Sequence, residues 1–552
     1  SSALTDTALT SDGNGIDSTP VTLGFTHSGL SALGLDAKTL ASFPEVFKDG
    51  MAARSSLLGD TGPSAPEAWD GVLGQPIVHG FFSGGFDVSG GEPVTEGEWA
   101  KVRKQVRTFN DRRGDEGLCL RAIIGLLFQL VGMEIVHLEI GQDPYRLLDD
   151  PDSPSEDAPG KLVDPIYPRR EHFGFRDGIS QPFVNLGDSP LPPGSGTAVR
   201  GNSWDPIAPG ELFLGAPDED GQFVPTPLNK TLRDGGTYVV FRKLEQDVAG
   251  WNAFLANQRA SEADRKKLAA EFMGRWQNGV SLVDSSTAEI KPSGDDELDL
   301  NDFRYAADDP HGLKCPLGAH ARRSNPRDIG GQNNVRRHRI LRRSMGYGGA
   351  LLPPGSAGDG EARGMLFIAV QSRIDLQFEM IQSNWINRGE FLGQVGLGAC
   401  PIVGPNDGRV HDAFLEAGEG APVTHLPRFV TLKGGDYFFS PSVAALKAIA
   451  DGQTLKIDEL PPYSGFGHGD TTAKGLFNPR RIAKLTLEAV NGTSTPKTFL
   501  MPGGTAPQDP ASDPVVFVRS HKDVKAVLDG GWDAASETIS MSMAQQNASS
   551  RL

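Results

Sequence analysis

The alternation of strand-like and helix-like segments limits the fold of this chain more than any other feature. Apolar, β-branched and aromatic residues fill short runs that are typical of strands, and longer amphipathic runs that are typical of helices follow them. A stretch rich in Pro, Gly and Asp, at 150–235, separates the upstream elements from the downstream ones. The pattern predicts an α+β protein with a weak two-half organisation. The downstream strands are predicted at 237–244 and 364–372, a helix with a turn inside it at 246–276, and two further helices at 374–387 and 443–451.

Composition narrows the possible partners. The 552 residues include 53 basic and 70 acidic side chains, which give a net charge of −17. Such a charge disfavours general binding to nucleic acid or to anionic membranes. The most apolar segment, 118–138, is interrupted by charged residues and therefore does not predict a membrane-spanning helix. The chain is expected to be soluble, and composition leaves secreted and cytoplasmic locations and the oligomeric state open.

One short segment is basic although the whole chain is acidic. It is KCPLGAHARRSNPRDIGGQNNVRRHRILRRSMGY at 314–347. Eight arginines follow His320 in this segment, and Asp328 is the only carboxylate between Arg322 and Arg343. This pattern predicts a bound anion rather than a solvated face of mixed charge. A lone histidine is more often a structural residue, but an imidazole beside many guanidinium groups fits haem, whose iron binds histidine and whose propionates bind arginine.

A second motif, GFRDG, places Asp177 on a tight loop between Gly174 and Gly178. Glycines at these positions allow the backbone to approach a cofactor closely. The GxxDG pattern alone is a weak signal, because GPNDG around Asp407 matches it equally well.

The order and separation of the motifs carry more information. FGFRDGISQPF, then CPLGAHARRSNPRD, then HRILRRSMGYG resemble the dye-decolourising peroxidase family of haem enzymes, and similar segments span about residues 20 to 510. The resemblance implies two ferredoxin-like halves of the dimeric α+β barrel type, with antiparallel sheets and haem bound mainly in the C-terminal half. It predicts an N-terminal half at 20–230 that carries GFRDG, a haem-binding half at 231–510 and an appended extension at 511–552.

The resemblance also implies roles for individual residues, with haem b (iron protoporphyrin IX) as the cofactor. His320 matches the proximal iron ligand, and Arg327, seven residues later, matches an arginine that binds a haem propionate. Arg322 is a further candidate for binding the cofactor. Asp177 matches the distal acid and Arg342 the distal arginine, so these two are the expected catalytic residues.

Two aromatic residues and one missing acid complete the expectations. Tyr347 and Trp385 match positions that some family members use to carry electrons from surface donors, although such residues usually lie in a core or at its rim. A histidine that binds a metal usually donates a hydrogen bond from its second ring nitrogen to an acceptor such as a carboxylate. Related sequences tend to carry an acid where this chain has Cys400, which leaves Asp407 and Asp412 as weaker candidates.

The implied function is a peroxidase that uses hydrogen peroxide to oxidise bulky aromatic donors, such as dyes and phenols, by one-electron steps. Cleavage of the O–O bond needs a group that moves a proton, for which Asp177 is suited, and a positive charge near the leaving oxygen, which Arg342 supplies. One alternative is a haem-binding protein for storage or iron release without peroxidase turnover. Another is an anion or nucleic-acid binding module, against which the net charge of −17 counts.

Overall fold

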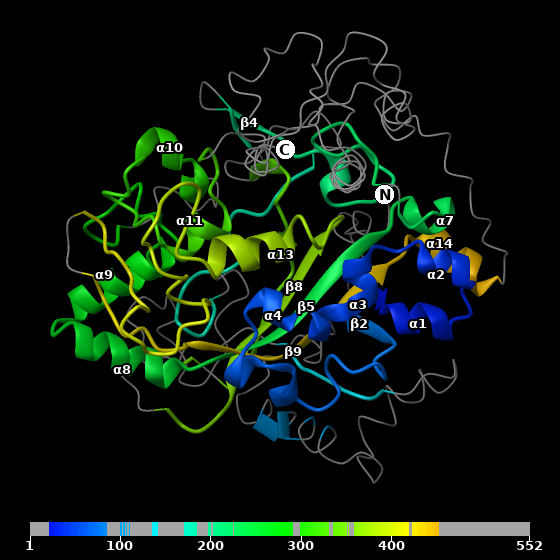
Figure 1. Ribbon diagram of the computed structural model, residues 1–552. Coiled ribbons are helices and arrows are strands. Elements are labelled where there is room, and N and C mark those ends of the chain that lie inside the picture. The colour runs from blue at the N-terminus through cyan, green and yellow to red at the C-terminus, as the bar shows by residue number, and fades with distance from the viewer. Residues whose placement is uncertain are drawn as a thin grey trace, which may run out of the picture.

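The computed structural model describes the greater part of the region between residues 21 and 451 (Figure 1). The described residues are 21–84, parts of 100–110, 135–141, 170–184, 197–199, 203–224, 226–290, 299–329, 335–349, 351–352, 358–418 and 422–451. The predicted extension at 511–552 lies outside these residues, as does most of the apolar segment 118–138.

A seven-stranded sheet forms the centre of the described structure, and every pair of neighbouring strands in it is antiparallel. The order of the strands is β2, β1, β9, β5, β8 and β6, and β7 also pairs with β8. Their bounds are β1 Val21–Phe25, β2 Gly80–Gly84, β5 Thr237–Gln246, β6 Leu341–Arg342, β7 Met345–Gly348, β8 Arg363–Gln371 and β9 Val430–Ser440. Two further strands, β3 (Thr197–Val199) and β4 (Ser203–Asp205), form a separate antiparallel pair.

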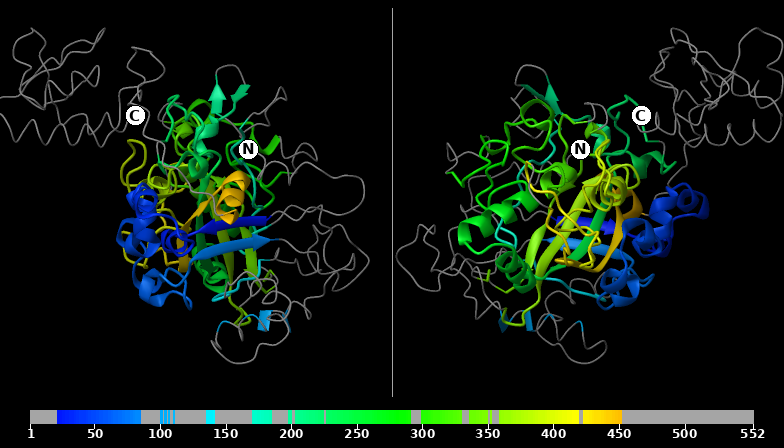
Figure 2. Two further views of the ribbon diagram at one scale, coloured as in Figure 1. Left: turned by 90° about the vertical axis from the view of Figure 1, so that its right-hand side faces the viewer. Right: turned by 60° about the vertical axis from the view of Figure 1, so that its left-hand side comes forward.

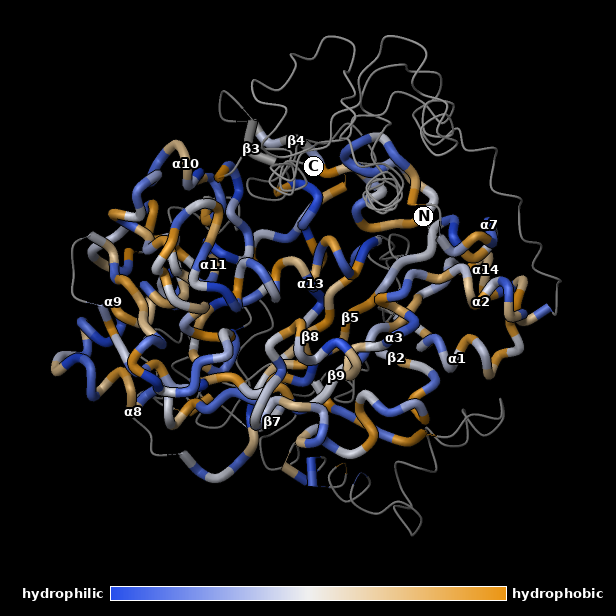
Figure 3. The backbone as a smooth tube through the Cα atoms, in the orientation of Figure 1, coloured by the Kyte–Doolittle hydropathy of each residue, from blue (hydrophilic) through white to orange (hydrophobic). Residues whose placement is uncertain are grey.

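The sheet buries both of its faces, which explains the nearly continuous apolar sequence of its central strand. Along β5, Tyr238 and Val240 face one hydrophobic core, whereas Val239 and Phe241 face another on the opposite side. Successive side chains of a strand point to opposite faces, so a strand between two cores needs apolar residues at every position. Figure 3 shows this apolar stretch along β5 and β8.

Short helices cover one face of the sheet. They include α1 (His27–Ala32), α2 (Ala37–Ala41), α3 (Glu45–Ala53), α4 (Ser55–Leu58), α7 (Lys230–Arg233), α13 (Phe378–Met380) and α14 (Val443–Ala450), and a π-helix, η5 (Ile381–Ile386), continues α13. Phe47 and Met51 of α3 and Phe378 of α13 enter the core on this face. In Figure 1, α3, α4 and α13 lie in front of the sheet.

Two longer helices, α8 (Val248–Gln258) and α9 (Glu262–Met273), lie at one end of the sheet, away from α1 and α2 (Figure 2). Side-chain caps mark their beginnings, since Asp247 accepts from the backbone N–H of Gly250 and Ser261 from that of Asp264. Helix α9 ends at Gly274, whose φ of 92° belongs to the left-handed region that favours glycine.

The α9 helix leads to the short segments that carry the basic sequence. Beyond it lie the 3-10 helix η4 (Asp299–Asn301), α10 (Tyr305–Asp308) and α11 (His320–Ser324). Ala270 of α9 lies in the same buried apolar cluster as Ala319, the residue directly before α11. This packing fixes the start of the helix on which His320 lies.

The predicted α+β class with an antiparallel sheet is confirmed. Within the described residues, strands from both sides of the predicted boundary at 230/231 share one sheet, because β1 pairs with β9 through Phe25 and Phe439. The boundary itself stays a prediction. Cys315 and Cys400 are buried free thiols. In the part of the chain that the structure describes, no helix is both long and apolar enough to cross a bilayer.

Candidate functional site

The loop that carries Asp177 is held by a buried carboxylate. Glu171 accepts hydrogen bonds from the backbone N–H groups of Phe173 and Phe175, both at 2.9 Å, and from Nε2 of Gln246 at 2.6 Å. Burial raises the pKa of Glu171 to about 7. These contacts tie the loop to β5 and set the direction in which the next residues leave.

The two glycines of the GFRDG motif give this loop its shape. Gly174 has a φ of 93° and Gly178 a φ of 81°, both in the region that favours glycine. A Cβ on Gly174 would lie 2.5 Å from Nε2 of Gln277, which donates to the carbonyl of Phe173. Between the glycines, the side chain of Asp177 retains 23% of its exposed surface.

Arg342 on β6 meets this loop, although 165 residues separate it from Asp177 in the sequence. Its Nη1 lies 3.4 Å from Oδ1 of Asp177, and its Nη2 donates to the carbonyl of Ile179 at 2.8 Å. Its backbone N–H also donates to Oε1 of Gln181 at 3.0 Å. The fold thus brings together the two residues that the sequence indicates for catalysis.

His320 is the first residue of α11, and its imidazole is partly buried. Nδ1 lies 3.3 Å from Sγ of Cys400, whereas Nε2 has the hydroxyl of Ser324 beside it, at 3.5 Å. Burial lowers the pKa of His320 to about 4, and the charges of Arg342 and Arg323 act in the same direction while Asp177 opposes them. The imidazole is therefore neutral near pH 7, which is the form that binds a metal.

Two of the charges that shift the pKa of His320 belong to Asp177 and Arg342. Both Asp177 and Arg342 act electrostatically on the His320 imidazole, so the three side chains lie within charge–charge range of one another. They come from the GFRDG loop, β6 and α11. Segments far apart in the sequence therefore form one cluster.

Arg323 holds α11 in place. Its guanidinium donates to the carbonyls of Trp385 at 2.7 Å, Arg388 at 2.8 Å, Gly398 at 2.7 Å and Gly318 at 3.2 Å. The side chain is completely buried, so these carbonyls depend on it for hydrogen bonds. The arginine joins α11 to η5 and to the loop that leads to Cys400.

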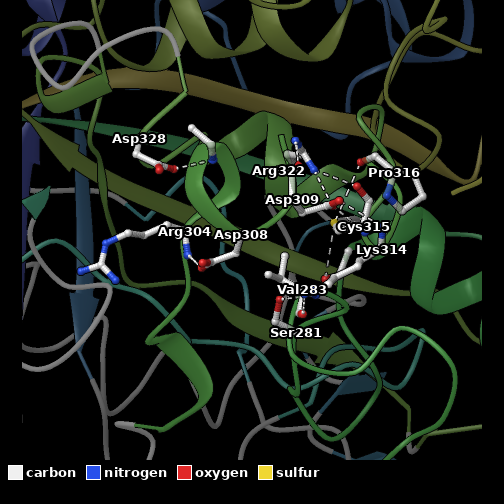
Figure 4. Close-up of polar contacts among 12 residues, drawn as sticks. Ser281, Val283, Arg304, Asp308, Asp309, Lys314, Cys315, Pro316, Arg322 and Asp328 are labelled. Atoms are coloured by element: carbon white, nitrogen blue, oxygen red, sulfur yellow. Dashed lines mark hydrogen bonds and ion pairs between the residues drawn. The ribbon is translucent and has the colours of Figure 1, made fainter. Parts of the chain in front are cut away.

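Arg322, in contrast, has contacts that do not support its predicted role in binding the cofactor. Its guanidinium pairs with the carboxylate of Asp309 at 3.0 Å and donates to the carbonyls of Asp309 and Cys315 (Figure 4). It also lies over the ring of Tyr305, 4.7 Å from the ring centre. The side chain is fully buried. These contacts favour a structural role, because they engage the guanidinium within the protein.

Arg327 is surrounded by backbone carbonyls, which bind its guanidinium, and by other positive charges, which repel it. It is buried, has a φ of 60°, and donates to the carbonyls of Asn301 and Phe303 at 2.7 and 2.9 Å. Burial lowers its pKa to about 9, and the charges of Arg275 and Arg339 act in the same direction. Positive charges therefore gather around it.

Arg339 belongs to the same group, and the sequence motifs did not single it out. Burial and the charge of Arg342 lower its pKa to about 10. Burial also raises the pKa of Asp284, the carboxylate whose charge acts on Arg327, to about 6. Buried guanidinium groups that repel one another fit a cofactor that carries acidic groups, as haem does. Arg339 lies within the basic run, which was the one sequence signal available for it.

Tyr347 and Trp385 do not lie at the surface. They retain 7% and 3% of their exposed surface, and Trp385 packs edge-on against His338 and Phe391. A residue that exchanges electrons with a surface donor needs exposure. The described structure therefore does not support the surface role predicted for these two residues.

The weaker candidates for the acidic partner of His320 are engaged elsewhere. The carboxylate of Asp412 accepts from the backbone N–H groups of Asp407 and Arg409, at 2.9 and 3.0 Å. Asp407 pairs with Arg409 at an exposed position. The partner that the structure gives to Nδ1 of His320 is Cys400.

Comparison with known sequences gives relatives of one enzyme type. Residues 219–392 match the family model of the Dyp-type peroxidase C-terminal domain. Peroxidase 2 of Mycetinis scorodonius is 29% identical over 78% of this chain and 76% of its own length. A dye-decolorizing peroxidase of Mycena epipterygia is 33% identical, and the multifunctional dye peroxidase DyP2 of an Amycolatopsis species is 35% identical. These two matches span 57% and 61% of the relatives' lengths and about half of this chain.

Solved structures give the same result. An ancestral D-type dye-decolorizing peroxidase superposes with a TM-score of 0.56 and 26% identity, over 78% of this chain and 85% of the other. A dye-decolorizing peroxidase in complex with 2,6-dimethoxyphenol superposes with a TM-score of 0.56 and 27% identity, over 78% and 86%. The antiparallel α+β fold, the matched family model and these relatives agree, and over 78% of its length this chain is similar to the dye-decolourising peroxidases, a family of haem enzymes.

Proposed function

We propose that this chain uses hydrogen peroxide to oxidise bulky aromatic donors, including dyes and phenols, by one-electron steps, with haem b as its cofactor. One observation supports the proposal most directly. Asp177 and Arg342 lie 3.4 Å apart, and both lie within electrostatic range of a neutral His320. A carboxylate that could carry a proton, a fixed positive charge and an imidazole that could bind a metal therefore lie near one another.

The residues of the site fit haem. His320 would bind the iron through Nε2, since Nδ1 already has Cys400 beside it. Arg327 and Arg339 would attract the propionates, because both guanidinium groups are buried near one another and an anion would relieve their repulsion. When bound, the haem supplies the redox chemistry that the side chains of the site cannot provide.

Asp177 and Arg342 would act on the peroxide. The carboxylate of Asp177 would take a proton from one peroxide oxygen and deliver it to the other, which becomes the leaving oxygen. The guanidinium of Arg342 would stabilise the negative charge that builds up on that oxygen. Its hydrogen bond to Ile179 at 2.8 Å fixes the guanidinium before the peroxide arrives.

The donor class rests on the relatives. The names of several related proteins refer to dyes, and one of the similar structures contains 2,6-dimethoxyphenol. We extend these donors to the present chain because its site residues occur in the corresponding fold.

The test uses the haem-loaded full chain and variants of each proposed residue. Wild type should change its Soret absorption rapidly after one equivalent of hydrogen peroxide and should then oxidise a dye or a phenol. Asp177→Asn should slow the reaction with peroxide by about 10²- to 10⁴-fold, and Arg342→Leu by about 10²- to 10³-fold, with haem retained. His320→Ala should lose stable haem.

Asp407→Asn is the matched control, because Asp407 lies in a GPNDG sequence of the same pattern but at an exposed position outside the site. It should react as wild type does. Haem binding without any reaction with peroxide would contradict the proposal and favour a storage or iron-release protein. Full turnover in Asp177→Asn and Arg342→Leu would exclude the mechanism.

A further inference from the structure

We infer that Cys400 is a positioning residue that holds the ligand imidazole of His320 through Nδ1, in place of a carboxylate. The inference rests on the proposed function, in which His320 binds the haem iron. It concerns the strength with which this ligand donates electrons to the iron. The distance of 3.3 Å between Nδ1 and Sγ is its starting point.

The position of the sulfur is fixed by the backbone around it. The N–H of Cys400 donates to the carbonyl of Ile386 at 2.7 Å, and its carbonyl accepts from Gly404 at 3.0 Å and from Nδ2 of Asn406 at 2.9 Å. The side chain is completely buried. Because the backbone is held and the surroundings are packed, the thiol has little freedom to turn away from the imidazole.

The direction of the hydrogen bond follows from the ligand role. A histidine that binds a metal through Nε2 carries its proton on Nδ1, so Nδ1 is the donor and the sulfur is the acceptor. Sulfur accepts hydrogen bonds weakly, and a thiol lacks the fixed negative charge of a carboxylate. The imidazole therefore gains less basicity than it would beside an aspartate.

Within the described residues, the acids do not substitute for this missing charge. Asp412 is engaged by the backbone of its own turn. Among the described residues, the carboxylate whose charge acts on the imidazole is that of Asp177, which forms the proposed catalytic pair with Arg342. The thiol at position 400 thus defines the environment of Nδ1.

The consequence is a haem iron that receives less electron density from its ligand. We expect its reduction potential to be more positive, and its iron–histidine stretching frequency lower, than in a form of the same chain with a carboxylate at position 400. The stretch is measured in the ferrous state by resonance Raman spectroscopy, and the potential by spectroelectrochemistry. Neither measurement depends on peroxidase turnover.

The experiment compares haem-loaded wild type with Cys400→Asp, Cys400→Ala and Cys315→Ala. Cys315 is the matched control, because it is also a fully buried thiol but lies 3.9 Å from the carbonyls of Gly274 and Pro316. Cys400→Asp should raise the stretching frequency and make the potential more negative. Cys400→Ala should lower the frequency slightly and make the potential more positive, whereas Cys315→Ala should match wild type.

An unchanged stretch and potential in Cys400→Asp would show that the side chain at 400 does not reach Nδ1, and would overturn the inference. If Cys400→Asp does not hold haem, Cys400→Ala provides the test. A stretching frequency and a potential equal to those of Cys315→Ala would then refute the contact between Cys400 and Nδ1 of His320. Absence of an iron–histidine stretch in every form, or haem binding in His320→Ala equal to wild type, would instead contradict the proposed function.

Discussion

The arginines of the basic segment are alike in the sequence, but each has a different environment in the fold. Arg322 is paired with Asp309 inside the protein, Arg323 binds backbone carbonyls, and Arg342 reaches the carboxylate that we propose to be catalytic. Guanidinium groups serve all these purposes because they have five donors and keep their charge when buried. A count of arginines therefore predicts that an anion binds nearby, but not which arginines contact it.

A buried acid gives a pH-dependent prediction at the scale of one residue. Burial raises the pKa of Glu211 to about 8, and the charges of Asp218 and Glu219 act in the same direction. Between the usual pKa of a glutamate and about 8, the folded chain keeps a proton that the unfolded chain releases. The stability from this group is therefore complete at low pH and is lost as the pH rises through that range.

Glu211→Gln should remove this dependence, because an amide resembles the protonated acid and does not titrate. From pH 5 to pH 8, wild type should lose free energy of unfolding relative to the variant, on the order of a few kcal/mol. Denaturant unfolding at several pH values measures the difference. Glu262→Gln, at an exposed position of α9, is the control and should run parallel to wild type. Parallel curves for Glu211→Gln as well would show that Glu211 is ionised in the fold.

At the scale of the elements, the small helix α11 depends on one side chain. The helix has five residues, which is too short to be stable by itself, and Arg323 links it to four backbone carbonyls. Arg323→Leu would leave these buried acceptors without donors. Because each unsatisfied group costs about 1–3 kcal/mol, we expect a loss of about 3 kcal/mol or more in the free energy of unfolding.

The same variant should bind haem more weakly, since α11 carries His320 and the clamped loop leads to Cys400. Denaturant unfolding and titration with haem measure the two effects. Arg343→Leu is the matched control, because Arg343 lies in the same basic segment but is exposed. Equal stability of the two variants would mean that the carbonyls find other donors and that α11 does not depend on Arg323.

The periodic elements could be predicted from the sequence with small errors. The strands predicted at 237–244 and 364–372 correspond to β5 (Thr237–Gln246) and β8 (Arg363–Gln371). The helix with an internal turn predicted at 246–276 corresponds to α8 and α9, with Ser261 capping the second helix. The segment at 374–387 forms α13 and the π-helix η5, a distinction that apolar periodicity does not make.

The contacts between elements could not be predicted in this way. Cys400 lies 80 residues after His320, and no periodic pattern relates them. The burial of Tyr347 results from packing on β5 and β8, which its own sequence does not reveal. Asp177 and Arg342 could be paired before the structure because the family resemblance carries tertiary information that composition and spacing lack.

At the scale of the whole molecule, the segments before and after residue 230 are joined by more than the chain. The sheet pairs β1 with β9, and Arg242 of β5 binds the carboxylate of Asp60 through two hydrogen bonds, of 3.0 and 2.5 Å. Both side chains of this ion pair are buried. A buried ion pair between distant segments makes each segment depend on the other.

Asp60→Leu should therefore destabilise the segments before and after residue 230 together. The substitution leaves the charge of Arg242 buried without its partner, which should cost about 3–5 kcal/mol of stability. Since β1 and β5 both pair with β9, the effect should spread through the sheet. Hydrogen exchange should then become faster in β1, β5 and β9 by similar factors.

Glu45→Gln is the control, because it removes an exposed carboxylate, paired with Lys48 of the same helix, and should leave these rates unchanged. Faster exchange confined to residues before 84 would mean that the two parts unfold independently and that the shared sheet does not couple them.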